Sequence, residues 1–304
     1  MSFLIRLPFD RYERDAFAGF RPGSFSIGNA RAAMWLAQVS YEDDTLKQDR
    51  ILEHWGVRRL VSYNRPFPSV LPMPSTGGFV AHGHDAVFVV FQGTDPLLLA
   101  NWLSDFDFLP NSLGIHQGFD KALDVVWNDI ATALEQAKPI SRLIVTGHSL
   151  GAALSALCAS RVADELGIIP EAVYAFGMPR VGTPAFAAKY NGKLGDRTYR
   201  LVHGTDIVPT VPPTKFGFCH VGRCIVCDAH ELFEARALAA QPSDEPPFLD
   251  SWWSAAKATV RRLFFRRDLL PTDPSPIIQA SRWLPAGFGD HLPDRYWRAL
   301  RHST

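Results

Sequence analysis

The chain has 304 residues, of which 47% are hydrophobic and 20% are charged, so it is long enough to bury a sizeable core. Its 31 lysine and arginine residues balance 31 aspartate and glutamate residues. This balance argues against a nucleic-acid-binding protein, because such proteins carry a basic excess. The sequence also has no apolar stretch long enough to predict a transmembrane helix.

The first part of the chain predicts helices followed by strands. Residues 26–60 show helical apolar periodicity, and a second amphipathic segment within them ends at Gly56. RRLVSYN then predicts a strand, and GFVAHGHDAVFVVFQGT predicts two strands joined across a Gly-His-Asp turn. Val87–Phe91 is a continuous apolar run, which is typical of a strand buried on both faces.

Further along the chain, predicted helices and strands alternate. The helices are HQGFDKALDVVWNDIATALEQ, 150–166 and 185–190, and the strands are 143–146, 172–176 and 197–202. Such alternation predicts βαβ units. We therefore expect an α/β fold with a mostly parallel central sheet flanked by helices.

The pattern changes after Ile207. FGFCHVGRCIVCD alternates around Gly222 and predicts a hairpin, and residues 240–280 predict a late helical insertion. Within the insertion, SWWSAAKATVRRLFFRR combines aromatic and basic side chains. We expect this helix to cap the core, and contact with anionic lipid is the alternative. The whole chain, 1–304, is predicted to be a single domain.

The stretch VTGHSLGAALSA carries the strongest chemical signal. A strand, then Gly-His-Ser-Leu-Gly, then a helix predict a nucleophile elbow, a sharp turn that presents Ser149 above the carboxyl edge of the sheet. The backbone N–H of Leu150 would then point at a developing oxyanion. A structural turn that happens to contain a serine is the alternative.

A serine nucleophile needs an orienting acid and a base, which follow it in that order in a fold of this kind. Asp206 directly follows a predicted strand and is the predicted acid, with an Asx turn as the alternative. His291, in the glycine-rich loop AGFGDHLPDRYW, is the predicted base. His220 and His230 are alternatives, whereas His302 is expected to fray.

A second oxyanion donor is predicted at the end of the early buried strand. VFVVFQGTD ends this strand with Gly93 and Thr94. A backbone N–H just past the strand would face the elbow, and the Thr94 hydroxyl would add a donor. A strand-ending turn capped by Thr94 or Asp95 is the alternative.

Several blocks of the sequence, in the correct order, resemble the class 3 lipases, an α/β-hydrolase family that includes the fungal triacylglycerol lipases. The resemblance covers roughly residues 25–230 and the region of His291. The blocks are VVFQGTD, NWLSDFDFLP with IHQGFDKAL, LIVTGHSLGAALSALCA, VYAFGMPRVG, RLVHGTDIVPTVPP and GDHLPDRYW.

The resemblance implies an α/β-hydrolase fold and assigns roles by motif. The assigned residues are the nucleophile Ser149, the acid Asp206, the base His291 and the oxyanion donors Thr94 and Leu150. The sequence departs from fungal members at Thr94, where they usually have serine, and at Gln92, where they tend to have arginine. Because threonine keeps the hydroxyl, we expect the oxyanion hole to survive.

The resemblance also implies a lid. DPLLLANWLSDF places the apolar segment Leu97–Leu103 beside the oxyanion strand, where it would face lipid when the lid opens. Packing of the same residues on the core is the alternative.

One cluster of cysteines invites a metal interpretation. CHVGRCIVCDAH places Cys219, Cys224, Cys227 and His230 close together, a spacing that suggests zinc ligands. Alternation in a hairpin would send neighbouring cysteines to different faces. We therefore expect buried thiols and no metal, with a disulfide across the hairpin as the alternative.

The sequence thus predicts a serine carboxylic-ester hydrolase that needs no cofactor. The resemblance implies a triacylglycerol lipase acting on lipid esters, with an oil–water or membrane interface as its place of action. The alternatives are a phospholipase or short-chain esterase of the same fold, and a non-catalytic lipid-binding module. Because MSFLIRLPFDRYERD lacks the features of a classical signal peptide, we expect a cytoplasmic protein or one exported by another route.

Overall fold

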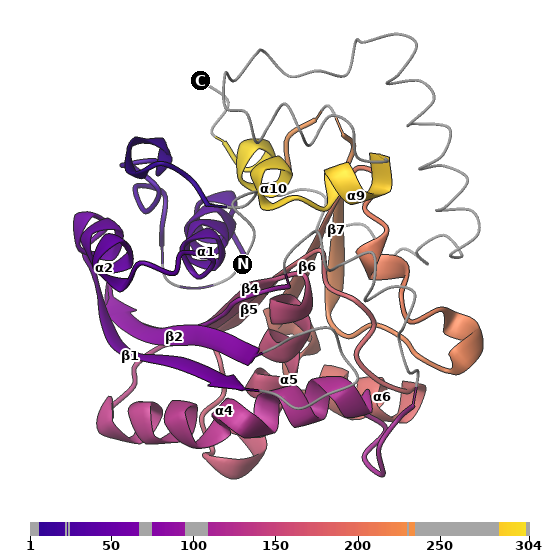
Figure 1. The fold of residues 1–304 in the computed structure, drawn as a ribbon. Coiled ribbons are helices and arrows are strands. Elements are labelled where there is room, and N and C mark those ends of the chain that lie inside the picture. The colour runs from indigo at the N-terminus through magenta and orange to yellow at the C-terminus, as the bar shows by residue number, and fades with distance from the viewer. Residues whose placement is uncertain are drawn as a thin grey trace, which may run out of the picture.

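A seven-stranded sheet lies at the centre of the computed structural model, which describes residues 6–66 apart from 22 and 24, 75–94, 109–234 apart from 230, and 286–301. The strands are adjacent in chain order (Figure 1). They are β1 (Val57–Pro66), β2 (Ser75–Gly83), β3 (Ala86–Phe91), β4 (Leu143–His148), β5 (Ala172–Phe176), β6 (Thr198–His203) and β7 (Arg223–Cys227). β1 to β3 pair antiparallel and β3 to β7 pair parallel, which confirms the prediction of a mostly parallel sheet.

The predicted turn between the second and third strands is also confirmed. His84 and Asp85 adopt left-handed φ angles of 53° and 58°, and Gly83 pairs with Ala86 across them. Two consecutive left-handed residues make the tight turn whose twist matches that of the flanking antiparallel strands.

Helices cover both faces of the sheet (Figure 1). They are α1 (Ile27–Val39), α2 (Thr45–His54), α4 (Gln117–Gln136), α5 (Leu150–Glu165), α6 (Pro184–Leu194), α9 (Ala286–Asp290) and α10 (Pro293–Ala299). In β3, Val87, Val89 and Phe91 pack in one core with α4, α5 and α6. Phe88 and Val90 point the opposite way and pack in a second core with α1 and α10. This alternation explains why β3 is apolar throughout.

The predicted hairpin around Gly222 is wrong. β7 pairs in parallel with β6. Cys219, which precedes the turn, instead forms an isolated antiparallel β-bridge with Gly182 through its backbone. Gly222 has φ 74° and lies so close to Thr198 that a Cβ would approach its Cγ2 to 2.5 Å. The turn at Gly222 therefore starts a parallel strand and not the second arm of a hairpin. The prediction failed because alternation in the sequence indicates a strand but does not specify its partner.

Two predicted segments, the lid at 97–103 and the helical insertion at 240–280, lie outside the described residues. The assignment of the chain to a single domain remains a prediction. None of the helices that the structure describes is long and apolar enough to cross a membrane.

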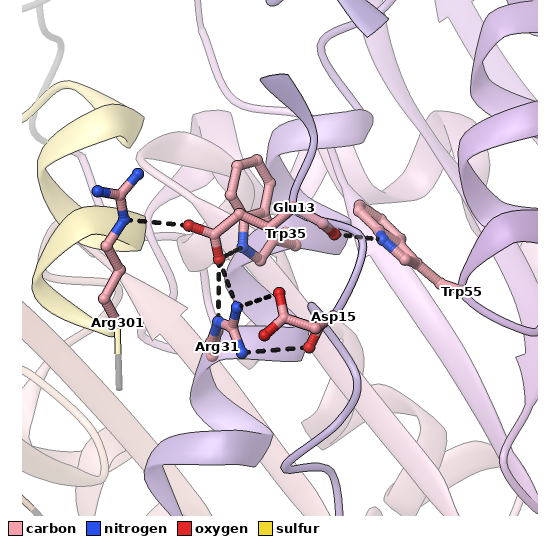
Figure 2. Close-up of polar contacts among 6 residues, drawn as sticks. All are labelled: Glu13, Asp15, Arg31, Trp35, Trp55 and Arg301. Atoms are coloured by element: carbon pink, nitrogen blue, oxygen red, sulfur yellow. Dashed lines mark hydrogen bonds and ion pairs between the residues drawn. The ribbon is translucent and has the colours of Figure 1, made fainter. Parts of the chain in front are cut away.

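A buried arginine anchors the N-terminal segment on α1 (Figure 2). Arg31 is only 4% exposed. Its Nε and Nη2 donate to Glu13 Oε2 at 3.0 and 2.6 Å, and Nη2 also donates to Asp15 Oδ1 at 2.8 Å. A buried charge is tolerated only when it is paired in this way.

The same glutamate connects the N-terminal segment to the end of α10 (Figure 2). Glu13 accepts hydrogen bonds from Trp35 Nε1 at 3.2 Å and from Arg301 Nε at 3.0 Å. Trp297 of α10 stacks on Trp35 with ring centroids 4.9 Å apart. We call Glu13, Asp15, Arg31, Trp35 and Arg301 the Glu13 cluster. It holds α10, and the loop that precedes it, against α1.

We predict that Glu13→Gln lowers the free energy of unfolding by about 2–3 kcal/mol, because Arg31 keeps its buried charge but loses its main partner. Urea unfolding measures the change. Asp196→Asn is the matched control, because it breaks a pair with Arg223 in which the aspartate is 87% exposed. The control should cost less than about 1 kcal/mol, and equal losses in both variants would contradict the prediction.

Candidate active site

Ser149 lies on a strained turn between β4 and α5. Its φ and ψ are 61° and −129°, a region that non-glycine residues rarely adopt. A Cβ on Gly147 would lie 2.3 Å from the carbonyl oxygen of Gly151, and a Cβ on Gly151 would lie 2.5 Å from that of Phe91. Both glycines are therefore required by close backbone contacts, as expected for an elbow.

Asp206 and His291 form a buried hydrogen-bonded pair. His291 Nδ1 lies 2.8 Å from Asp206 Oδ2, and both residues are almost fully buried. Because a carboxylate only accepts hydrogen bonds, Nδ1 carries the proton, and Nε2 of the neutral ring is left unprotonated. Within the described residues, neither His291 Nε2 nor the Ser149 hydroxyl has a hydrogen-bond partner, although both atoms are buried.

The pair lies at the carboxyl edge of the sheet, beside the elbow. The rings of His291 and His148 have centroids 4.6 Å apart, and His148 directly precedes Ser149. Gly177, which follows β5, has φ 59°, and a Cβ there would lie 2.7 Å from Asp206 Oδ2 and 2.9 Å from His291 Nδ1. The ends of β4 and β5 therefore form the surface on which the histidine and aspartate rest.

A tyrosine supports the aspartate. Tyr296 of α10 donates its hydroxyl to Asp206 Oδ2 at 2.5 Å, and the Val208 N–H donates to Oδ1 at 2.9 Å. Burial, followed by the negative charge of Asp206, raises the pKa of Tyr296 well above its usual value, so the phenol stays protonated and remains a donor. The sequence predicts no role for Tyr296, because its contact partner Asp206 lies 90 residues earlier in the chain and the contact leaves no local pattern.

The carboxylate of Asp290 connects the segment that carries His291 to the segment that carries Asp206. Asp290, fully buried beside His291, accepts hydrogen bonds at 2.8 Å from both the backbone N–H and the hydroxyl of Thr205. Gly204 allows this approach, because a Cβ there would lie 2.5 Å from Asp290 Oδ2. The residues before the histidine and before the aspartate are therefore tied together independently of the pair itself.

The predicted oxyanion donors lie at the same edge. Leu150 is the first residue of α5, so its N–H has no acceptor within the helix. Thr94 is buried, and its hydroxyl has no hydrogen-bond partner among the residues that the structure describes. Gly93 packs against the elbow, since a Cβ there would lie 2.4 Å from the carbonyl oxygen of His148. Because Gly93 and His148 directly precede Thr94 and Ser149, this contact brings the backbone N–H of Thr94 close to the turn that carries Ser149.

The structure distinguishes between the histidines that are candidates for the base. His291 reaches Asp206, whereas His220 Nε2 donates to the carbonyl oxygen of Pro209 at 2.8 Å. His230 and His302 lie outside the described residues.

The three cysteines around β7 are free thiols. Burial raises the pKa of Cys227 to about 12, so this thiol stays protonated and is a poor nucleophile. Among the described residues, no group of three or more histidine, cysteine or acidic side chains is arranged to hold a metal ion. His230 is not described, so the absence of a metal at this cluster stays a prediction.

Comparison with known proteins identifies similar sequences and folds. A family model described as "Lipase (class 3)" matches residues 88–216. A lipase of Rhizomucor miehei is 38% identical over 161 residues, which cover 48% of this chain and 44% of that protein. A secreted mono- and diacylglycerol lipase, LIP1, of Malassezia globosa is 37% identical over 149 residues, which cover 44% and 49%.

Solved structures extend the similarity. A triacylglycerol lipase, described as having a serine protease triad as its catalytic centre, is 28% identical with a TM-score of 0.56. The match covers 67% of this chain and 82% of that one. The similarity establishes an α/β-hydrolase fold, as the sequence predicted. The chain spans about half the length of the curated relatives that it matches.

We predict that stability falls as the pH drops below about 6.5, the usual histidine pKa. Burial lowers the pKa of His148 and His203 in the folded protein. Below pH 6.5 the unfolded chain therefore binds protons that the folded chain does not, and each histidine costs up to about 1.4 kcal/mol per pH unit until its folded pKa is reached.

Urea unfolding between about pH 7.5 and pH 5 measures this slope. His148→Phe should reduce the slope, whereas His82→Asn, at an exposed position of β2, should leave it unchanged. A slope that is the same in all three proteins would contradict the prediction.

Proposed function

The chain belongs to the class 3 lipase family, and from this premise we propose that it is a serine carboxylic-ester hydrolase that cleaves triacylglycerol through an acyl-enzyme on Ser149. One observation carries the proposal. The Nδ1 atom of His291 is paired with Asp206, while its Nε2 atom and the Ser149 hydroxyl are buried and lack partners among the described residues. Buried polar atoms without partners are costly and mark places where a substrate completes the bonding.

His291 acts as the general base. Its Nε2 takes the proton of Ser149 as the serine oxygen attacks the ester carbonyl carbon. The resulting imidazolium is stabilised by the carboxylate of Asp206, which hydrogen bonds from Val208 and Tyr296 hold in place. The imidazolium then returns the proton to the departing alcohol.

The oxyanion is held by the backbone N–H groups of Thr94 and Leu150. Their donors are fixed before the reaction by packing of the strand end against the elbow, so little reorganisation is needed when the negative charge develops. The Thr94 hydroxyl adds a third donor. Water then attacks the acyl-enzyme, with His291 again as base, and releases the acid. No step in this sequence requires a cofactor.

A lipid–water interface is the proposed place of action. The names of the relatives, lipase and mono- and diacylglycerol lipase, support a lipid ester as the substrate. Leu109, Leu113 and Phe216 are exposed apolar side chains. Their two segments meet where the ring of His116 contacts that of Phe218, at a centroid distance of 5.5 Å. Exposed apolar side chains on neighbouring segments are compatible with contact with lipid.

We predict that the wild-type protein hydrolyses emulsified triacylglycerol and is labelled on Ser149 by a fluorophosphonate, whereas Ser149→Ala loses at least about 10⁴-fold in rate and all labelling. Peptide mapping locates the label, and titration of released acid gives the rate. Labelling without triacylglycerol hydrolysis would point to a phospholipase or a short-chain esterase. Absence of both would point to a non-catalytic lipid-binding module and would overturn the proposal.

We predict that Gly177→Ala lowers kcat by about 10²-fold or more, because the new Cβ would displace the Asp206–His291 pair. Gly167→Ala is the matched control. Gly167 has a similar φ of 66°, but a Cβ there meets nothing within 4 Å. Both variants carry similar backbone strain. Equal kcat values for the two variants would show that the contact at Gly177 does not matter for activity.

A further inference from the structure

His148 lies buried behind the nucleophile, among three aromatic rings. It is the last residue of β4 and is only 2% exposed. Its ring centroid lies 4.6 Å from that of His291, 5.5 Å from that of Tyr296 and 6.1 Å from that of Tyr41. The proposed mechanism gives this imidazole no role, although it contacts the proposed base directly.

Both ring nitrogens of His148 are hydrogen-bonded. Nε2 lies 2.7 Å from the backbone carbonyl oxygen of His291, and Nδ1 lies 2.8 Å from the hydroxyl of Tyr41. Because a carbonyl oxygen only accepts, Nε2 is the donor. In the neutral ring, Nδ1 then accepts from the Tyr41 hydroxyl. The partners of the ring thereby specify one tautomer.

His148 is neutral during the proposed reaction. Burial, followed by the neighbouring His291, lowers its pKa well below the usual value. With its only lone pair engaged by Tyr41, His148 does not compete with His291 for the proton of Ser149. A neutral ring also avoids electrostatic repulsion of the imidazolium that forms on His291.

We infer that His148, held by Tyr41, is a positioning residue that fixes the backbone of His291 and thereby aims its Nε2 at Ser149. The inference rests on the proposed function. Asp206 holds the histidine ring at Nδ1, but a ring held at one atom can still swing with its loop. Fixing the carbonyl oxygen as well restrains the main chain from which the ring projects, so the base is preorganised.

Tyr41 extends this support to the oxyanion segment. A Cβ on Gly93 would lie 2.1 Å from the Tyr41 hydroxyl oxygen, so that hydroxyl packs directly against the residue before Thr94. One buried Tyr41–His148 unit therefore contacts both the proposed base and the strand end that carries a proposed oxyanion donor. A shift of this unit would disturb the two sides of the site together.

The test compares two substitutions of His148. His148→Phe keeps an aromatic ring but removes the donor to His291, so we expect kcat to fall about 10²-fold while KM changes less than about threefold. His148→Gln keeps an amide N–H that reaches the same carbonyl oxygen. It should recover most of the loss and remain within about tenfold of the wild-type kcat.

Thr146→Val is the matched stability control. Thr146 is fully buried on the same strand, and its hydroxyl donates to Tyr174 and Ala33 without contacting His291. The control should lose stability but keep kcat and KM per folded molecule. Urea unfolding of every variant gives the folded fraction to which the rates are normalised.

The possible results separate the two proposals. A wild-type protein that is not labelled on Ser149 by a fluorophosphonate would overturn the proposed function, whatever His148 does. A labelled, active wild type together with an unchanged kcat in His148→Phe would overturn only the positioning role. A loss of the same size in His148→Phe and His148→Gln would also overturn it, because the retained donor should restore activity.

Discussion

The buried hydrogen bond between His291 and Asp206 joins segments 85 residues apart, and the surrounding structure keeps those segments in register. A bond of this kind has a narrow range of distance and angle, so small shifts of either loop would break it. Asp290 ties the two loops through Thr205, and Tyr296 holds the carboxylate from α10. The pair is therefore one part of a buried polar network.

The parallel part of the sheet explains why these groups meet. In parallel strands the carboxyl ends lie along one edge, so the residues that follow β3, β4, β5 and β6 are neighbours in space. Thr94, Ser149, Gly177 and Asp206 each follow one of these strands. His291 reaches this edge from the C-terminal part of the chain. The position of His291 depends most on contacts from other segments, because the loop that carries it is not part of the sheet.

The N-terminal segment contributes to the site from a distance. Glu13 holds Arg31 on α1 and Arg301 beyond α10, and Trp35 stacks on Trp297. These contacts dock α10 on α1 (Figure 1). Since α10 carries Tyr296 and begins two residues after His291, it links the Glu13 cluster to the sheet edge that carries the proposed catalytic residues. Stability and site geometry are thus coupled through α10.

The sequence alone determined the elements and the order of the proposed catalytic groups. Periodicity marked the helices and strands, and the glycines around Ser149 marked the elbow, because these signals arise between residues close together in the chain. The hairpin predicted from the sequence at β7 was wrong, because alternation does not specify a partner strand. Nor does the sequence indicate the contacts of Tyr296, Asp290 or His148 with the aspartate and histidine loops. Only the tertiary structure decided those contacts, since hydrogen bonds between segments brought together by folding leave no periodic pattern in the sequence.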